Sequence, residues 1–525
     1  MRRGTEWPAL GAVIGLGAWL RLIGLGRRSL WLDEAMSAGY LDFSAADVLR
    51  LTAEPKGVHP PLYFLAMQAW CGVFGESEAA LRGLSAACGI ATILTTFVLV
   101  RDLLRLGRWS GPAASYSPWI AAGLVALSPM QVHLGRIARG YTMVELAVGL
   151  AAIMVVRALR GLPRSGAAWI GAAILSLLAC YVHHLAVLTI AAIGLFTVLC
   201  LLDDRLRGNS IDRSALRWAF LAGALFAAGY LAPWLPKVLS QTQTVRTQSN
   251  PWPITAERAV RQASSAAIAT FDDGWWHPGW LAWSASITVV VLLVTVGACG
   301  GRPGWYCAAT GLIPPILMAA FSLRSNRSIF HARYLCFAQM SWLIVAAIAS
   351  SAGISRLRGS VERLLLASMV MLLAGYACLE SWRTIGPESR PGMRAAMEYV
   401  AKRYAEGEPI VVRTPYAFFG AHYYARGWGR PRLCVPDTDR EAVFGSEHLR
   451  DDDLVTPDRI APPGTTGIWL ISTDSYDPTL ALAIEPGPGW VRSDRAEFPQ
   501  DQFIERPVVV EYYRIGPPVD GGPSR

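Results

Sequence analysis

The stretch GAAWIGAAILSLLACYVHHLAVLTIAAIGLFTVLCLL, residues 166–202, contains no charged residue, and its most polar point is the adjacent pair His183 and His184. A helix needs about 20 apolar residues to cross the hydrocarbon core of a bilayer. The stretch is too long for one such helix, and imidazoles are unfavourable in contact with lipid. It therefore predicts two membrane helices, 166–182 and 185–203, joined by a turn at the membrane surface.

The rest of the chain shares this apolar character. Of its 525 residues, 53% are hydrophobic and only 17% are charged, which excludes an ordinary soluble multidomain protein. We find no nucleic-acid-binding motif and expect no nucleic-acid partner. The sequence predicts an all-α polytopic membrane protein with about eleven transmembrane helices. They lie near 8–25, 82–104, 117–134, 141–159, 166–182, 185–203, 215–235, 280–299, 304–322, 331–352 and 361–380.

The distribution of arginine orients these helices. Lys and Arg concentrate in the cytoplasmic loops of membrane proteins. With a cytoplasmic N-terminus, all five inner linkers are basic; they hold Arg101, Arg105, Arg108, Arg157, Arg160, Arg164, Arg205, Arg207, Arg213, Arg217, Arg302, Arg356, Arg358 and Arg363. Counting the shorter apolar segment 61–75 as a span would reverse every later helix, so we predict that it is an interfacial helix. The expected location is the inner (plasma) membrane.

This topology places the C-terminal part of the chain outside the cytoplasm. After about residue 383 the sequence is more charged and richer in Pro and Gly. A helical pattern at 391–406 precedes three strand-like segments, PIVVRT (409–414), GIWLIS (467–472) and PVVVEYYRI (507–515). We therefore predict a transmembrane module, 1–383, and a small extracytoplasmic α/β domain, 384–525.

Two outer turns carry arginines against the charge bias. Arg139 and Arg333 are each closely followed by a tyrosine, Tyr141 and Tyr334. Guanidinium groups suit phosphate through their permanent charge and fork geometry. The alternative is that these arginines reach lipid headgroups. We favour a bound anionic ligand for Arg139 and Arg333.

Three histidines lie at the same predicted surface. His59 precedes two prolines that fix a rigid entry into the interfacial helix, and His183 and His184 form the turn described above. One of that pair is expected to pack, and the other to contact phosphate or a metal. A divalent metal is left open, although no familiar ligand spacing is present. No other cofactor is expected.

Asp33 and Glu34 stand side by side just after the first apolar stretch, in the outer loop 26–81. Adjacent acids in such loops are usually solvated charges. Beside cationic groups and a lipid phosphate, however, a carboxylate is suited to act as general base on an acceptor hydroxyl, while the cations stabilise the departing phosphate. One carboxylate suffices for a single-displacement, inverting transfer.

Five segments in this order resemble a known group of proteins: LWLDEAMS (30–37), HPPLYF (59–64), ESEAALRGLSA (76–86), ALSPMQVHLGRIARGYT (126–142) and HARYL (331–335). They are similar to polytopic glycosyltransferases of the protein-mannosyltransferase and aminoarabinose-transferase type, family 39-like, which have the GT-C fold. The resemblance covers roughly residues 1–350.

The resemblance implies an outer-facing active site, a polyprenyl-phosphate sugar donor and an acidic base in the first outer loop. Asp33 then takes the role of base with Glu34 beside it, and His59, Arg139, Tyr141, Arg333 and Tyr334 line the donor phosphate site. Two departures concern the acceptor and the metal. Protein mannosyltransferases carry a further acid in the turn that corresponds to 132–142, where the nearest acid here is Glu145. The lipid-modifying branch has an acid and a lysine where this chain has Val58 and His59.

The predicted function is inverting transfer of a sugar, a hexosyl or pentosyl group, from a polyprenyl-phosphate donor to an acceptor on the outer face of the membrane. The acceptor (glycan, lipid or protein) stays open. A lipid-linked glycan flippase or transporter is an alternative, although no duplicated half is visible. A polysaccharide polymerase or ligase that uses a pyrophosphate-linked donor is another, and a non-catalytic assembly protein is a third.

Overall fold

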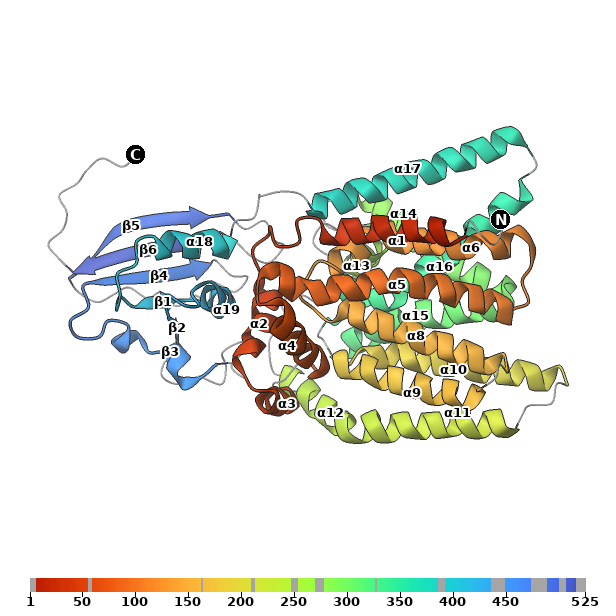
Figure 1. Cartoon of the computed structure of the whole chain (residues 1–525), viewed down its shortest axis with the longest axis horizontal. Coiled ribbons are helices and arrows are strands. Elements are labelled where there is room, and N and C mark those ends of the chain that lie inside the picture. Colours follow the sequence, from red (N-terminus) through yellow and green to blue (C-terminus); the bar gives the residue numbers. More distant parts are fainter. Residues whose placement is uncertain are drawn as a thin grey trace. The chain divides into compact units, whose positions relative to one another are not determined.

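The computed structural model describes most of the chain (Figure 1). The described residues are 6–54, 59–161, 164–208, 213–246, 254–269, 278–325, 328–357, 359–385, 392–435, 449–473, 489–499 and 507–515. They form two compact units, neither of which is continuous in sequence. The bundle unit comprises Met1–Leu25, Thr52–Met67 and Arg82–Ile385, and the sheet unit comprises Gly26–Leu51, Gln68–Leu81 and Gly386–Arg525.

The bundle unit is helical, as expected from the apolar segments. Its helices are α1 (Glu6–Leu22), α4 (Leu62–Phe74), α5 (Glu78–Leu106), α6 (Gly111–Leu127), α7 (Pro129–Leu134), α8 (Tyr141–Leu159), α9 (Ser165–Val182), α10 (Ala186–Leu206), α11 (Arg213–Phe226), α12 (Ala232–Arg246), α13 (Ala256–Ile268), α14 (Gly279–Cys299), α15 (Gly301–Ser325), α16 (Ala332–Arg356) and α17 (Ser360–Ile385). A π-helical segment, Ala227–Leu231, joins α11 to α12. Helices α4 and α5 begin or end in the sheet unit.

Eight of the described helical segments are long and apolar enough to cross a membrane, so the chain is a multi-pass membrane protein. They are α5, α8, α9, α10, the continuous segment Arg213–Ser240, α14, α15 and α16. Shorter apolar helices lie at Trp7–Leu22, Leu62–Phe74 and Ala114–Leu127. The predicted count of eleven spans, and the orientation of the termini, remain predictions.

The expected helix 117–134 is not continuous. Helix α6 ends at Leu127, and Ser128 leaves the helical region, with φ −56° and ψ 124°. The cause is Pro129, because a proline disfavours helical geometry in the residue before it. The Ser128 hydroxyl then accepts the Gln131 N–H at 3.5 Å and begins the short helix α7. This break turns the chain toward the Arg136–Tyr141 turn.

The sheet unit contains a six-stranded mixed sheet in the order β3-β2-β1-β4-β6-β5. Its strands are β1 (Ile410–Val412), β2 (Pro431–Cys434), β3 (Leu454–Val455), β4 (Gly467–Thr473), β5 (Trp490–Phe498) and β6 (Val508–Ile515). The first four in the order are parallel, and β6 and β5 are antiparallel to their neighbours. The strand-like segments at 409–414, 467–472 and 507–515 are confirmed as β1, β4 and β6. The short strands β2 and β3 and the polar strand β5 were not expected.

Helices complete the sheet unit. Helix α18 (Gly392–Ala401) is shorter than the predicted helix 391–406, and α19 (Pro415–Tyr424) follows β1. The loop 26–81 supplies α2 (Leu32–Gly39), a 3-10 turn (Tyr40–Asp42) and α3 (Ala45–Ala53). Helix α2 packs against α19 within this unit. The α/β fold of the C-terminal region is therefore confirmed, while the proposed division at residues 383 and 384 stays a prediction.

Candidate functional site

Six predicted site residues from four separate segments of the bundle unit lie together. The His183 ring centroid lies 5.3 Å from that of His59, 5.8 Å from Tyr141 and 5.4 Å from Tyr334. Phe337, one turn after Arg333 on α16, adds a ring at 5.3 Å. We call this group, with Arg139 and Arg333, the His183 cluster; its members are His59, Arg139, Tyr141, His183, Arg333, Tyr334 and Phe337.

Close backbone packing holds the turn that carries Arg139 and Tyr141. A Cβ on Gly140 would lie 2.6 Å from Val182 Cγ1 and 3.3 Å from Tyr63 Cβ, so only glycine fits between the end of α9 and the start of α4. The Ser85 hydroxyl donates to the Arg139 carbonyl at 2.8 Å. The contacts with Val182, Tyr63 and Ser85 therefore fix the backbone of this turn and explain why residue 140 is glycine.

Arg139 contacts His59 directly. Its Nη2 lies 2.6 Å from His59 Nε2. Because a guanidinium only donates hydrogen bonds, His59 Nε2 must be the acceptor and the proton of the neutral ring must be on Nδ1. The pair therefore presents one positive charge and an additional N–H donor.

His183 has the opposite tautomer. Its Nδ1 accepts the Leu185 N–H at 3.2 Å, so the proton of the neutral ring is on Nε2. Nε2 is buried and has no hydrogen-bond partner among the described residues. A buried N–H donor without an acceptor is costly, and here it lies at the centre of the ring cluster. It is therefore available to a ligand acceptor.

Both rings are held neutral. Burial lowers the pKa of His59 and of His183 well below 6.5; Arg139 lowers the pKa of His59 further, and His184 and Arg139 lower that of His183. The cationic charge of the cluster is therefore carried by arginine. Arg333 lies over the Tyr334 ring, with its Cζ 5.2 Å from the centroid.

His184, the other half of the predicted pair, lies in a different group of side chains. Its Nδ1 is 2.8 Å from the Tyr230 hydroxyl, and its ring centroid is 5.0 Å from that of Trp234. Burial lowers the pKa of His184 to about 4. Tyr181, in the same group, donates to the Gly229 carbonyl at 2.9 Å in the π-helical segment. The two histidines of the turn therefore have different surroundings, and which of them contacts a ligand stays a prediction.

Arg136, in the same turn as Arg139, binds backbone. Its guanidinium donates to the carbonyls of Leu20, Arg21, Ile23 and Gly24 at 2.8–3.3 Å. These are carbonyls at the C-terminal end of α1, which lack partners within the helix. Arg136 therefore secures a helix end, and the two arginines of the turn differ in what they contact.

Asp33 and Glu34 belong to the sheet unit, whereas the His183 cluster belongs to the bundle unit. Within this unit the two acids differ in burial and in their hydrogen bonds. Glu34 is 1% exposed, and its Oε2 accepts the Trp31 N–H at 3.4 Å, which caps the start of α2. Asp33, in the first turn of the same helix, keeps part of its surface exposed. Asp33 is therefore the less buried member of the pair.

Glu145 lies one turn after Tyr141 on α8 and is 2% exposed. Its Oε1 accepts from Gln131 Nε2 at 2.6 Å, and the same nitrogen donates to Gln339 Oε1 at 2.9 Å. Gln339 Nε2 donates in turn to Ser128 Oγ and to the Ala266 carbonyl. We call this chain of amides the Glu145 network. Sequence reasoning missed it, although Gln131 and Gln339 stand out as amides in apolar segments.

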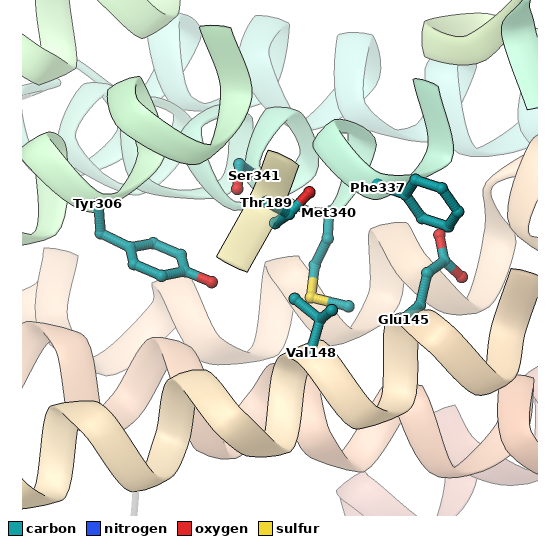
Figure 2. Close-up of a pocket in the computed structure, with 7 residues that line it drawn as sticks. All are labelled: Glu145, Val148, Thr189, Tyr306, Phe337, Met340 and Ser341. Carbon is teal, nitrogen blue, oxygen red and sulfur yellow. The ribbon is translucent and has the colours of Figure 1, made fainter. Parts of the chain in front are cut away.

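A cavity of about 10 Å³ adjoins the Glu145 network. Figure 2 shows the side chains that line it: Glu145, Val148, Thr189, Tyr306, Phe337, Met340 and Ser341. Glu145 Oε2 and Thr189 Oγ1 are buried without a hydrogen-bond partner among the described residues. The cavity has room for roughly one water molecule.

The next question is whether side chains that could bind a metal lie close together. In the described part of the chain, no group of three or more His, Cys, Asp or Glu side chains is arranged to hold a metal ion. In the His183 cluster, one histidine nitrogen accepts from Arg139 and another from a backbone N–H. The arrangement offers N–H donors and positive charge, which suit an anion better than a cation.

Comparisons with known proteins place the fold. No protein-family model and no curated protein sequence matches the chain. Two solved structures of ArnT from Cupriavidus metallidurans are similar over 97% of this chain and 98% of theirs. One is in the apo state (TM-score 0.57, 16% identity), and the other is bound to undecaprenyl phosphate (TM-score 0.55, 17% identity).

The archaeal oligosaccharyltransferase AglB from Archaeoglobus fulgidus, in complex with an inhibitory peptide and a dolichol-phosphate, is similar over 81% of this chain and 64% of its own (TM-score 0.51, 13% identity). The chain therefore has the GT-C fold that its motifs predicted. At these identities the likeness concerns the fold.

Proposed function

We propose that this protein is a glycosyltransferase that moves a sugar from a polyprenyl-phosphate donor to an acceptor on the outer face of the membrane. The observation that carries the proposal is the His183 cluster, in which segments far apart in sequence bring a guanidinium and buried N–H donors together. The GT-C fold supports it, because ArnT has been solved with undecaprenyl phosphate and AglB with a dolichol-phosphate.

The donor phosphate is the ligand that we assign to the cluster. Arg139 supplies charge, and His183 Nε2–H supplies a directed donor at a site that is only 8% exposed. In such surroundings hydrogen bonds to a charged oxygen are stronger than in water. The same groups would stabilise the negative charge that grows on the phosphate as the bond to the sugar breaks.

The proposed base is Asp33. In a single displacement, the base removes the proton from the acceptor hydroxyl while the acceptor oxygen attacks the anomeric carbon, and the polyprenyl phosphate departs with the bonding electron pair. Inversion at the anomeric carbon follows from one displacement. Glu34 serves as a cap of α2 and is not assigned a chemical role.

The test compares Asp33→Asn with Glu34→Gln in membranes supplied with candidate polyprenyl-phosphate sugars. Loss of a general base costs about two to four orders of magnitude in rate. We expect that loss for Asp33→Asn, with unchanged insertion and folding, and a much smaller loss for Glu34→Gln. Glu34→Gln is the matched control, because it removes a neighbouring charge from the same helix.

Other outcomes point to the other functions. Normal transfer by both variants would remove Asp33 as the base. If the wild type accepts only pyrophosphate-linked donors, the protein is a polymerase or ligase. If labelled lipid-linked sugar crosses the membrane without transfer, the flippase alternative replaces the proposal. The stereochemistry of the product tests inversion separately.

A further inference from the structure

We propose that the C-terminal sheet domain positions the proposed base, with Tyr424 and Arg394 as the positioning residues. The inference rests on the proposed function, since it concerns the helix that carries Asp33. All the contacts that support it lie within the sheet unit, where the first outer loop and the C-terminal domain form one compact body.

Tyr424, the last residue of α19, holds the chain just before α2. Its hydroxyl accepts the Leu30 N–H at 2.8 Å and lies 3.3 Å from Ser29 Oγ. The same hydroxyl donates to Glu78 Oε1 at 3.1 Å. Burial, and then Glu78, raises the pKa of Tyr424 to about 12, so the hydroxyl keeps its proton. One side chain of the C-terminal domain therefore fixes a backbone N–H only three residues before Asp33.

Arg394, on α18, holds the chain slightly earlier. Its guanidinium donates to the carbonyls of Gly26, Arg27 and Arg28 at 2.8–3.2 Å. Its Nε donates to Glu78 Oε1 at 2.9 Å, and its backbone N–H donates to Ser29 Oγ at 3.2 Å. Three successive carbonyls bound by one guanidinium leave little freedom to the segment that leads into α2.

The other end of α2 is also tied to the C-terminal domain. Arg426 donates to the Ala38 carbonyl at 3.3 Å and to Asp42 Oδ1 at 2.8 Å. His422 Nε2 lies 3.2 Å from Asp42 Oδ2. Between these two ends α2 packs along α19. The helix is therefore fixed at both ends and along one face by residues that lie nearly 400 positions later in the sequence.

Contacts that fix the position of α2 affect the reaction rate if Asp33 is the base, but not if Asp33 is a solvated loop charge. A catalytic group must be within hydrogen-bond reach of the proton that it removes, and a displacement of about 1 Å can reduce the rate by about 100-fold. If Asp33 is the base, weakening the contacts of Tyr424 or Arg394 lowers kcat. The KM for the donor should stay unchanged, because we assign the donor phosphate to residues of the bundle unit.

The experiment uses the full-length protein and compares Tyr424→Phe with Tyr399→Phe. The Tyr399 hydroxyl donates to Asp494 inside the same domain and is a matched control. We measure kcat, the KM for the donor, the affinity for sugar-free polyprenyl phosphate, and amide hydrogen exchange across residues 30–40. For Tyr424→Phe we expect kcat to fall by about 10-fold, faster exchange in that segment, and unchanged phosphate affinity.

A second pair of variants, at two arginines, tests whether the result depends on replacing a tyrosine. Arg394→Gln removes the guanidinium that binds the three carbonyls, whereas Arg492→Gln removes one that pairs with Glu511 inside the sheet at 2.9 Å. The first should lower kcat and accelerate exchange at 30–40. The second should do neither, although it loses a comparable ion pair of the same domain.

The outcomes separate the two proposals. If exchange at 30–40 does not change in Tyr424→Phe or Arg394→Gln, the positioning proposal is wrong, whatever the activity. If both controls lower kcat as much as the two variants, the contacts only stabilise the domain, and positioning is again wrong. If exchange increases as expected but the wild type transfers no sugar, the domain holds α2 and the proposed function fails.

Discussion

Helix α8 borders two polar regions of the same bundle, one turn apart. Tyr141 belongs to the His183 cluster, and Glu145 belongs to the Glu145 network. The cluster combines an arginine with a buried N–H donor that lacks an acceptor among the described residues. In the network, Gln131 donates to Glu145 and to Gln339. Gln339 in turn donates to the Ser128 hydroxyl and to the Ala266 carbonyl.

Both regions leave buried polar atoms without a partner among the described residues: an N–H donor in the cluster, and the acceptors Glu145 Oε2 and Gln131 Oε1 in the network. The cluster places its donor beside an arginine, which suits the anionic phosphate that we propose as its ligand. A network of amides that bond to one another links helices and leaves a cavity for roughly one water. Phe337 takes part in both regions, since it packs on His183 and lines the cavity beside Glu145 (Figure 2). The assignment of ligand site and structural network can be tested by substitutions on each side.

The largest effect is expected from Arg139→Gln. It removes the charge that contacts His59, and removal of one donor to a developing anion costs about 100- to 1,000-fold in rate. We expect a loss of that size in kcat/KM for the donor. Arg136→Gln is the control in the same turn: it should lower the melting temperature by exposing the end of α1 while leaving the affinity for polyprenyl phosphate unchanged. Equal losses of affinity in both variants would contradict the assignment.

A smaller effect is expected from His183→Phe, which keeps the ring and removes the Nε2–H. A hydrogen bond to a charged group is worth about 1.5–3 kcal/mol, so the dissociation constant for polyprenyl phosphate should rise by about 10- to 100-fold. His184→Phe loses the contact with Tyr230 and a buried Nε2 that also has no partner among the described residues. Because His184 lies outside the His183 cluster, this variant should change the dissociation constant less than about twofold. If His184→Phe weakens binding as much as His183→Phe, the ligand lies on the other side of the turn.

Glu145→Gln should barely affect donor binding, because the network makes no contact that we assign to the phosphate. The glutamine oxygen can still accept from Gln131, so the expected change in unfolding free energy is about 1 kcal/mol. Glu145→Leu leaves the Gln131 N–H without this acceptor and should cost about 1–3 kcal/mol. Thermal unfolding in detergent measures both. A large loss of phosphate affinity in Glu145→Gln would move the ligand site into the network.

The smallest effect concerns pH. Because burial lowers the pKa of His59 and His183 well below 6.5, we expect both rings to stay neutral at neutral pH. A phosphodiester donor also keeps one negative charge near neutral pH, so its KM should change less than about twofold there. If a histidine bound the phosphate as a cation, affinity would fall as pH rises through its pKa. The lowered pKa values also mean that the unfolded chain binds protons first, so stability is lost as pH falls below about 6.5.

Neighbouring residues of the same type often contact different partners in this protein, and the sequence does not predict which partner each one contacts. Arg136 and Arg139 share one turn, yet one binds carbonyls of α1 and the other binds His59. His183 and His184 are neighbours, yet their rings join different groups. Asp33 and Glu34 are neighbours, yet Glu34 caps its own helix. Each distinction depends on a partner or on helix geometry that residue type alone does not reveal.

The sequence by itself determined the apolar segments that become helices, the strands β1, β4 and β6, and the GT-C fold that its motifs resemble. The helices and strands follow from local composition, because about 20 apolar residues or a short β-branched run carry their own signal. The GT-C fold was expected from the resemblance of five motifs to a known family. Only the tertiary structure decided that His59, Arg139, Tyr141, His183 and Tyr334 meet, and that the loop 26–81 joins the C-terminal domain in one unit. These arrangements rest on contacts between residues far apart in the chain, which local spacing does not encode.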